Sequence, residues 1–185
     1  ARFEEANFAI LSANVEPDDA LPNVQPYLLQ QVKGHTVAII GVTAQVAEER
    51  AQAYEMTLTI GDPVDAVQRA VTEVRDQADI IILLGNLDPE MNVTLAQQIA
   101  GIDAIIGVYK SGQVRAGTID GPEGTVVLQA SGIQGEYLGV LSLHFDAEGR
   151  VEWFSGQVFP LTAHNYADDP EMVEIIRRHA ARSGS

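Results

Sequence analysis

Short apolar runs alternate with amphipathic stretches along the first part of the chain. Segment 8–14, FAILSAN, is an apolar run with small residues and predicts a buried strand. The runs 27–33 and 36–42 predict two strands joined by a two-residue turn at Gly34-His35, which suits a β-hairpin. The second strand of this hairpin is apolar almost throughout, as expected of a strand that is covered on both faces.

The next segment carries the clearest helix signals in the chain. Residues 43–61 show no dominant pattern, and we expect a loop there with a short strand near 56–60. Asp62 can cap a helix, and Pro63 suits its first position. Apolar residues then recur at helical spacing, which predicts an amphipathic helix: Val64, Val67, Val71, Val74 and Ala78.

Two further apolar runs follow, separated by a second helical pattern. Runs 80–84 and 102–107 predict buried strands, and residues 91–100 predict a helix between them. Strand and helix alternate through this region, which is typical of a parallel sheet with right-handed crossovers. The fold class predicted for this part is therefore α/β.

The last third of the chain changes character. Runs 125–130, 137–145 and 151–159 predict three strands with no helix between them, and so an antiparallel meander. Asp169 and Pro170 mark the start of a closing helix. The whole pattern is a parallel βαβαβ unit followed by antiparallel strands.

Length and charge narrow the classes of function. The chain has 185 residues, of which 46% are hydrophobic, so it is long enough for one domain with a core and too apolar for a disordered tail. Its net charge of −15 opposes binding to nucleic acid and to anionic membranes. No run approaches the roughly 18 apolar residues of a membrane helix. Cysteine is absent, which excludes disulfides and thiolate sites.

Both ends suggest a piece of a longer protein. The chain opens on Ala1 without a visible signal peptide, and it closes on Ser183-Gly184-Ser185. We divide it into a partial domain at 1–160 and a linker with an exit helix at 161–185.

The polar residues that follow the parallel strands are the candidates for a site. In an open α/β sheet, ligands bind beyond the carboxyl ends of the strands, where the loops 85–90 and 108–113 lie. The alternative is that both loops are ordinary polar turns. The side chains that would contribute to a site are Asn86, Asp88, Tyr109, Lys110 and Ser111.

Other patterns of catalysis are missing from the sequence. The four histidines do not show the spacing of a metal pair: His35, His144, His164 and His179. There is neither a glycine-rich phosphate loop nor a Gly-x-Ser-x-Gly elbow. No pair of carboxylates for acid–base work can be picked out.

Six segments, in order, resemble the second half of the catalytic domain of the 5′-nucleotidase family of metallophosphoesterases. The segment 99–112, for example, resembles the family stretch that ends in "IIGGHSH". The segments that carry the resemblance are FAILSANV at 8–15, YLLQQVKGHTVAIIGVTA at 27–44, DPVDAVQRAVTEVRDQADIIILLGNL at 62–87, IAGIDAIIGVYKSG at 99–112, VLQASGIQGEYLGVLSLHFD at 127–146 and DDPEMVEIIRRH at 168–179.

The resemblance implies the second half of a four-layer α/β/β/α sandwich, in which two metal ions hydrolyse phosphate esters of nucleotides. This chain departs from the family at the metal ligands. Asn86 stands where the family has the His of "SHL", and Tyr109 and Ser111 stand where it has the two His of "GHSH". Lys110 places a cation beside the former metal position, and the first-half motifs would lie upstream of Ala1.

Two functions follow from this resemblance. The first is a domain that has lost its metal ligands and serves as a non-catalytic scaffold or interaction module, with no cofactor. The second is a divergent metal-dependent phosphoesterase that hydrolyses nucleotides. Its missing ligands would come from the absent N-terminal half, and only under this alternative do we expect a pair of divalent metal ions. A redox partnership is a third idea that no motif supports.

The resemblance also sets expectations for partners and location. The expected partners are the missing N-terminal half, other protein modules or a second copy of the chain, and neither nucleic acid nor a membrane. The expected location is extracytoplasmic, periplasmic or secreted, by family resemblance only.

Overall fold

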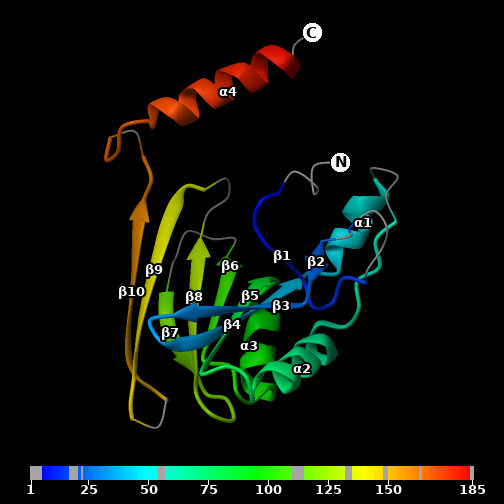
Figure 1. Cartoon of the computed structure of the whole chain (residues 1–185), viewed down its shortest axis with the longest axis vertical. Helices are drawn as coiled ribbons and strands as arrows, with labels where there is room; N and C mark the ends of the chain where they lie inside the picture. The colour runs from blue at the N-terminus through cyan, green and yellow to red at the C-terminus, as the bar shows by residue number, and fades with distance from the viewer. Residues whose placement is uncertain are drawn as a thin grey trace.

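A six-stranded sheet with four parallel strands at its centre forms the main body of the molecule (Figure 1). The computed structural model describes residues 6–16, 21, 23–53, 57–109, 115–131, 135–147, 150–162 and 164–183. The strands, in their order across the sheet, are β3 (Tyr27–Val32), β4 (His35–Thr43), β5 (Ile80–Asn86), β6 (Ala104–Tyr109), β8 (Thr125–Ser131) and β7 (Arg115–Ile119). The four central strands run parallel, and the two edge strands β3 and β7 are antiparallel to their neighbours.

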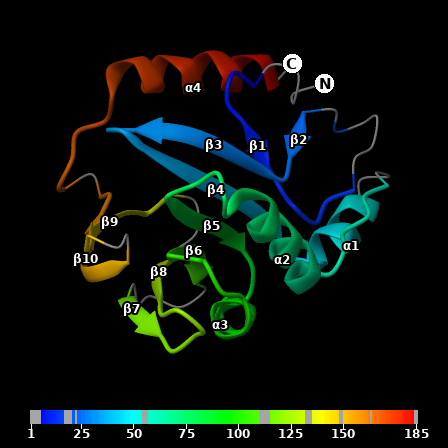
Figure 2. The same ribbon diagram turned by 60° about the horizontal axis from the view of Figure 1, so that its bottom comes forward.

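The helices α2 (Pro63–Val74) and α3 (Pro89–Gln98) pack on this sheet, and Figure 2 shows both on the same side of it. Asp62 caps α2, because its Oδ1 accepts a hydrogen bond of 2.9 Å from the amide of Asp65. The core between helices and sheet is mostly apolar, and its largest fully buried apolar side chains are Ile40, Leu83, Leu95, Ile99, Ile105, Val67, Val71 and Val74. The predicted helix and parallel strands are therefore confirmed.

The hairpin turn differs by one residue from the prediction. The central residues of the turn are Lys33 and Gly34, with φ of 51° and 90°, and Val32 pairs with His35 across the hairpin. Positive φ at both central positions is the requirement of a type I′ turn, whose twist matches that of the strands. His35 is therefore the first residue of β4, and the predicted turn at Gly34-His35 was wrong.

A short helix, α1 (Val46–Gln52), forms where the sequence predicted only a loop. The helix has seven residues and no capping hydrogen bond from the side chain of Gln45, so its sequence signal was weak. A carboxylate oxygen of Glu48 accepts a hydrogen bond from the amide of Ile60, which anchors α1 to the following segment. The strand expected near 56–60 is reduced in the described residues to a single bridge between Val15 and Ile60.

The first predicted strand is also shorter than expected. Only β1 (Ile10–Leu11) is regular within 8–14, and it pairs in parallel with β2 (Val24–Gln25). The rest of the segment turns its small polar residues toward β4, as described below.

In the last third of the chain, β9 (Tyr137–Phe145) and β10 (Val151–Pro160) form a separate antiparallel hairpin. The run at 125–130 belongs instead to the parallel sheet, because β8 pairs with β6 on one side and with β7 on the other. The predicted antiparallel character holds for β9 and β10, but β8 is not part of that pair. The closing helix α4 (Pro170–Ser183) begins as predicted, since Oδ1 of Asp169 accepts hydrogen bonds from the amides of Glu171 and Met172.

Candidate functional site

The carboxyl ends of the four parallel strands meet at one edge of the sheet. The register places Thr43 beside Asn86, and Tyr109 beside Ser131. Asn86 is exposed, and its backbone carbonyl accepts a hydrogen bond of 3.1 Å from the amide of Ala44. The strand ends thus carry hydroxyl and amide residues, and none of the four is an imidazole or a carboxylate.

The structure brings three of the five candidate residues to this edge. Asp88 precedes α3 at its N-cap position, and its carbonyl oxygen accepts hydrogen bonds from the amides of Met91 and Asn92 at 3.1 and 3.2 Å. Asn86 and Tyr109 end β5 and β6. Lys110 and Ser111 lie outside the described residues, and the same holds for the rest of the loop up to 114.

A buried polar cluster next to the edge was missed by the sequence reading. Ser12 and Asn14 are almost fully buried, and the Ser12 Oγ lies 2.8 Å from the Thr43 Oγ1. The amide nitrogen of the Asn14 side chain donates to the carbonyl oxygens of Thr43 and Gly61, and its Oδ1 accepts from the amide of Thr43. The cluster satisfies its own hydrogen bonds, so it fixes the end of β4. Small polar residues inside the run FAILSAN were its only signal.

Asn92 of α3 was missed as well, although it lies between the two strand ends. Its side chain is fully buried. A Cβ atom on Gly85 would lie 2.6 Å from the Asn92 Oδ1, and one on Gly107 would lie 2.6 Å from its Nδ2. Within the described part of the chain neither amide atom has a hydrogen-bond partner. The two glycines therefore make the space that lets a polar side chain reach the sheet.

The residues present at the edge do not fit the metal pair that the family resemblance implies. At the ends of β4 and β5, Thr43 and Asn86 offer neutral oxygens, which are weak ligands for transition metals compared with imidazole or carboxylate. No three His, Cys, Asp or Glu residues in the described ranges form a group that could hold a metal ion. His35 lies 3.9 Å from Asp79, and the His144 ring stacks on Trp153. The first contact lies at the starts of β4 and β5, at the opposite end of the sheet from Thr43 and Asn86, and the second belongs to the β9–β10 hairpin.

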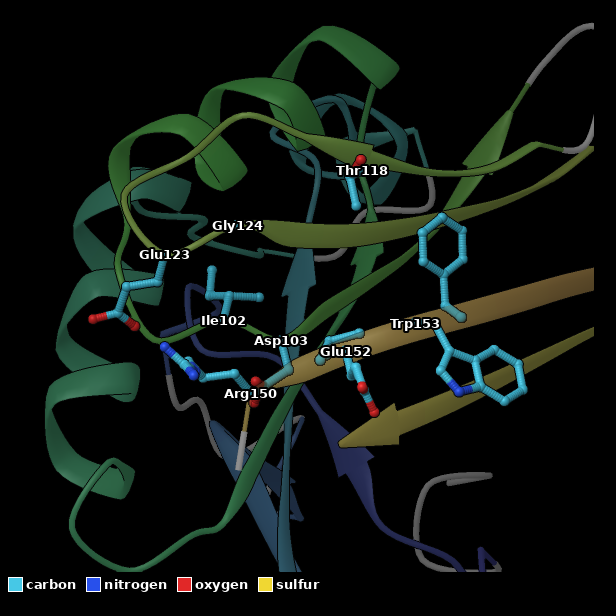
Figure 3. A pocket seen from close by; sticks show the side chains of 10 residues that line it. Ile102, Asp103, Thr118, Glu123, Gly124, Arg150, Glu152 and Trp153 are labelled. Carbon is cyan, nitrogen blue, oxygen red and sulfur yellow. The ribbon is translucent and has the colours of Figure 1, made fainter. Parts of the chain in front are cut away.

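A large pocket lies at the other end of β6. Its volume is about 840 Å³, and it is formed by the loop that enters β6, by the β7–β8 turn and by the start of β10 (Figure 3). Asp103 in this pocket is half-buried, and its Oδ2 accepts a hydrogen bond of 2.7 Å from the amide of Ile81. The pKa of the Asp103 carboxyl is raised to about 6, chiefly because the group is buried. The hydrogen bond from the Ile81 amide opposes this rise, and the nearby charge of Glu123 adds to it. The sequence reading gave no signal for this group.

The chain is similar in sequence to proteins named apyrase and 5′-nucleotidase, although no family model matches it. It is 28% identical to an apyrase of Aedes albopictus over 95% of this chain and 35% of the apyrase. It is 29% identical to the 5′-nucleotidase of Homo sapiens over 95% of this chain and 34% of that protein. The chain therefore spans about a third of the length of these relatives.

Solved structures show the same relationship at the level of the fold. A 5′-nucleotidase precursor from Thermus thermophilus matches 98% of this chain and 39% of its own length, with a TM-score of 0.77 and 23% identity. The calcineurin-like phosphoesterase YfkN from Bacillus subtilis matches 98% of this chain with a TM-score of 0.71 and 23% identity. The chain is thus homologous to one segment of the proteins of the 5′-nucleotidase family, and it folds as that segment does.

Proposed function

We propose that this chain is a 5′-nucleotidase-like unit that has lost its metal ligands and serves as a non-catalytic scaffold or interaction module of a larger protein. The observation that carries the proposal is the set of residues where β5 and β6 end and just beyond β6 in the sequence. There Asn86, Tyr109 and Ser111 replace three imidazoles of the family pattern. Amide and hydroxyl oxygens bind transition metals weakly, and a phenol with a reference pKa of about 10 binds well only when ionised. Lys110 adds a positive charge that opposes a dication.

A second function is a divergent metal-dependent phosphoesterase that hydrolyses nucleotides. The observation that favours it is the length of the relatives, because the chain corresponds to only 34% of the human 5′-nucleotidase. Under this alternative, the metal ligands come from parts of a longer protein, and the edge formed by Thr43 and Asn86 only borders the site.

Metal content and turnover separate the two functions. We would purify the 185-residue chain and the longest natural polypeptide that contains it, dialyse both against Zn²⁺ and Mn²⁺, and measure bound metal and phosphate release from nucleoside monophosphates. We expect no stoichiometric metal and no metal-dependent turnover in either protein. Stoichiometric metal with turnover in the longer protein would establish the enzyme and overturn the non-catalytic proposal.

A ligand-restoring variant is the matched control. Asn86→His, Tyr109→His and Ser111→His together return the imidazoles of the family pattern, whereas the same three positions changed to Ala do not. We expect the His variant to bind Zn²⁺ at least tenfold more tightly than the Ala variant in titration calorimetry. Wild-type binding as tight as that of the His variant would contradict the loss of the ligands.

The proposal includes the organisation and the location of the chain. We propose a partial domain at 1–160 and a linker with an exit helix at 161–185, the part of the chain that contains α4. Its partners are the other half of the domain, further modules or a second copy. The family resemblance favours an extracytoplasmic location. No helix in the described ranges is long and apolar enough to cross a membrane.

A further inference from the structure

We propose that the pocket at the amino end of β6 binds a small organic cation, namely a primary amine on an apolar body. Its volume of about 840 Å³ lies within the range of roughly 300–1,000 Å³ that is typical of sites for small molecules. Three segments that are distant in the sequence form it, at 102–103, 118–124 and 150–154. It lies at the opposite end of β6 from Tyr109, so the proposal is independent of the metal question.

The charges that line the pocket favour a cation. Three carboxylates and one guanidinium line it, from Asp103, Glu123, Glu152 and Arg150 (Figure 3). The guanidinium is already paired, because the Arg150 Nη2 lies 2.9 Å from the Asp146 Oδ2 and its Nε donates to the same oxygen at 3.0 Å. The pocket therefore holds an excess of negative charge, in a chain whose net charge is −15. An anionic ligand would be repelled.

Asp103 is the group best placed to receive the ammonium. The hydrogen bond from the Ile81 amide to its Oδ2 fixes the carboxylate at the entrance of β6. Burial and Glu123 destabilise its charged form, as the raised pKa of this carboxyl shows. A bound cation would offset that cost, because an opposite charge within a few ångströms stabilises a carboxylate.

The other walls suit the apolar body of such a ligand. Ile102, Val151 and Phe154 line the pocket. Phe154 pairs with Leu143 in the β9–β10 register, and both are half-buried, which places them on the face of the hairpin that is not exposed. The carboxylates do not form a metal site, since no three acidic or His residues of the described ranges are arranged to hold an ion. An amine with a hydrocarbon body matches both kinds of wall.

Binding of cyclohexylmethylamine tests the proposal. We would compare it by titration calorimetry with cyclohexylmethanol and cyclohexanecarboxylate, which carry similar bodies with a neutral or a negative group. Trp153 is the single tryptophan of the chain and lines the pocket, so its fluorescence locates the binding. We expect saturable binding of the amine with a change in Trp153 emission, and at least tenfold weaker binding of the other two compounds.

Two variants that each remove one negative charge distinguish binding in the pocket from a general effect of the chain's negative charge. We expect Asp103→Asn to weaken amine binding at least tenfold, while its carbonyl still accepts from the Ile81 amide. Asp76→Asn removes an exposed charge after α2 and should leave the affinity within twofold. If Asp103→Asn does not fold, Glu152→Gln takes its place, with an expected loss of at least threefold. Equal binding of all three compounds, absence of saturable heat, or equal effects of the pocket and control variants would overturn the proposal.

Discussion

At the scale of single residues, Asn92 sets a strict size limit at two strand positions. A Cβ atom on Gly107 would lie 2.6 Å from the Asn92 Nδ2, closer than van der Waals contact allows. We expect Gly107→Ala to lower the free energy of unfolding by about 1–3 kcal/mol, because the packed core cannot make room without strain. Urea denaturation monitored by circular dichroism measures this change.

Two further variants test whether the contact with Asn92 causes the loss of stability. Gly117→Ala in β7 should change stability little, since nothing lies within 4 Å of the added atom. Changing Asn92 to Ala in the Gly107→Ala background should recover part of the loss, because the clashing amide is gone. Additive losses in the double variant would contradict the assigned contact.

Asp103 gives stability a pH dependence of its own. Its pKa rises from 3.8 to about 6 on folding, so between these values the unfolded chain has released a proton that the folded chain retains. Stability from this group is therefore greatest at low pH and falls as pH rises through about 6. Glu123, Glu152 and Arg150 face the same pocket and remain in every variant compared.

Replacement of Asp103 by Asn should remove this dependence. We expect the variant to exceed the wild type by about 1–3 kcal/mol in unfolding free energy at pH 8, and the difference to vanish near pH 4. Urea denaturation at both pH values measures it, with Asp76→Asn as the matched control. A variant that is less stable at pH 8 would show that the charged carboxylate is stabilising instead.

Individual residues also show which features of the edge and the pocket the sequence could predict and which it could not. Asn86 and Asp88 were placed correctly at the sheet edge, because the carboxyl ends of parallel strands are fixed by the chain direction. Asn14 and Asp103 were missed, because their importance comes from burial and from partners 22 to 47 residues away. A local pattern does not report such distant contacts.

At the scale of elements, local signals predicted α2 far better than α1. The helix α2 has a capping aspartate, a proline at its first position and an apolar stripe that packs against β4. The local sequence signals and the tertiary packing therefore favour the same helix. The helix α1 lacks a capping side chain and has no buried residue. Likewise, β8 joins the parallel sheet through its pairing with β6, which no property of residues 125–130 alone reveals.

The cap of α2 makes a prediction at this scale. Asp62→Ala removes the acceptor of the Asp65 amide and should lower the unfolding free energy by about 1 kcal/mol. Asp62→Ser keeps an acceptor at the same place and should restore most of the loss. Thermal denaturation of the three proteins measures both effects, and equal destabilisation by Ala and Ser would indicate that charge, not the hydrogen bond, is responsible.

At the scale of the whole molecule, one face of the β9–β10 hairpin is not covered by any part of the chain that the structure describes. The other face contacts β7 and β8. The register puts Leu138 opposite Phe159 on the outer face, and Val140 lies on the same side. These three side chains are 52%, 36% and 41% exposed. A contiguous apolar surface of this kind is typical of a protein–protein interface.

Self-association through this face is the expectation for the isolated chain, and its dependence on salt follows from the net charge. Two copies of −15 repel each other, and salt screens that repulsion, so we expect the dimer fraction at tens of micromolar to rise between 20 mM and 500 mM NaCl. Multi-angle light scattering measures the fraction. Val140→Glu places a charge in the apolar face and should yield a monomer at both salt concentrations. Val46→Glu makes the same change at an exposed position of α1 and should not. A wild-type monomer at high salt would contradict self-association through this face.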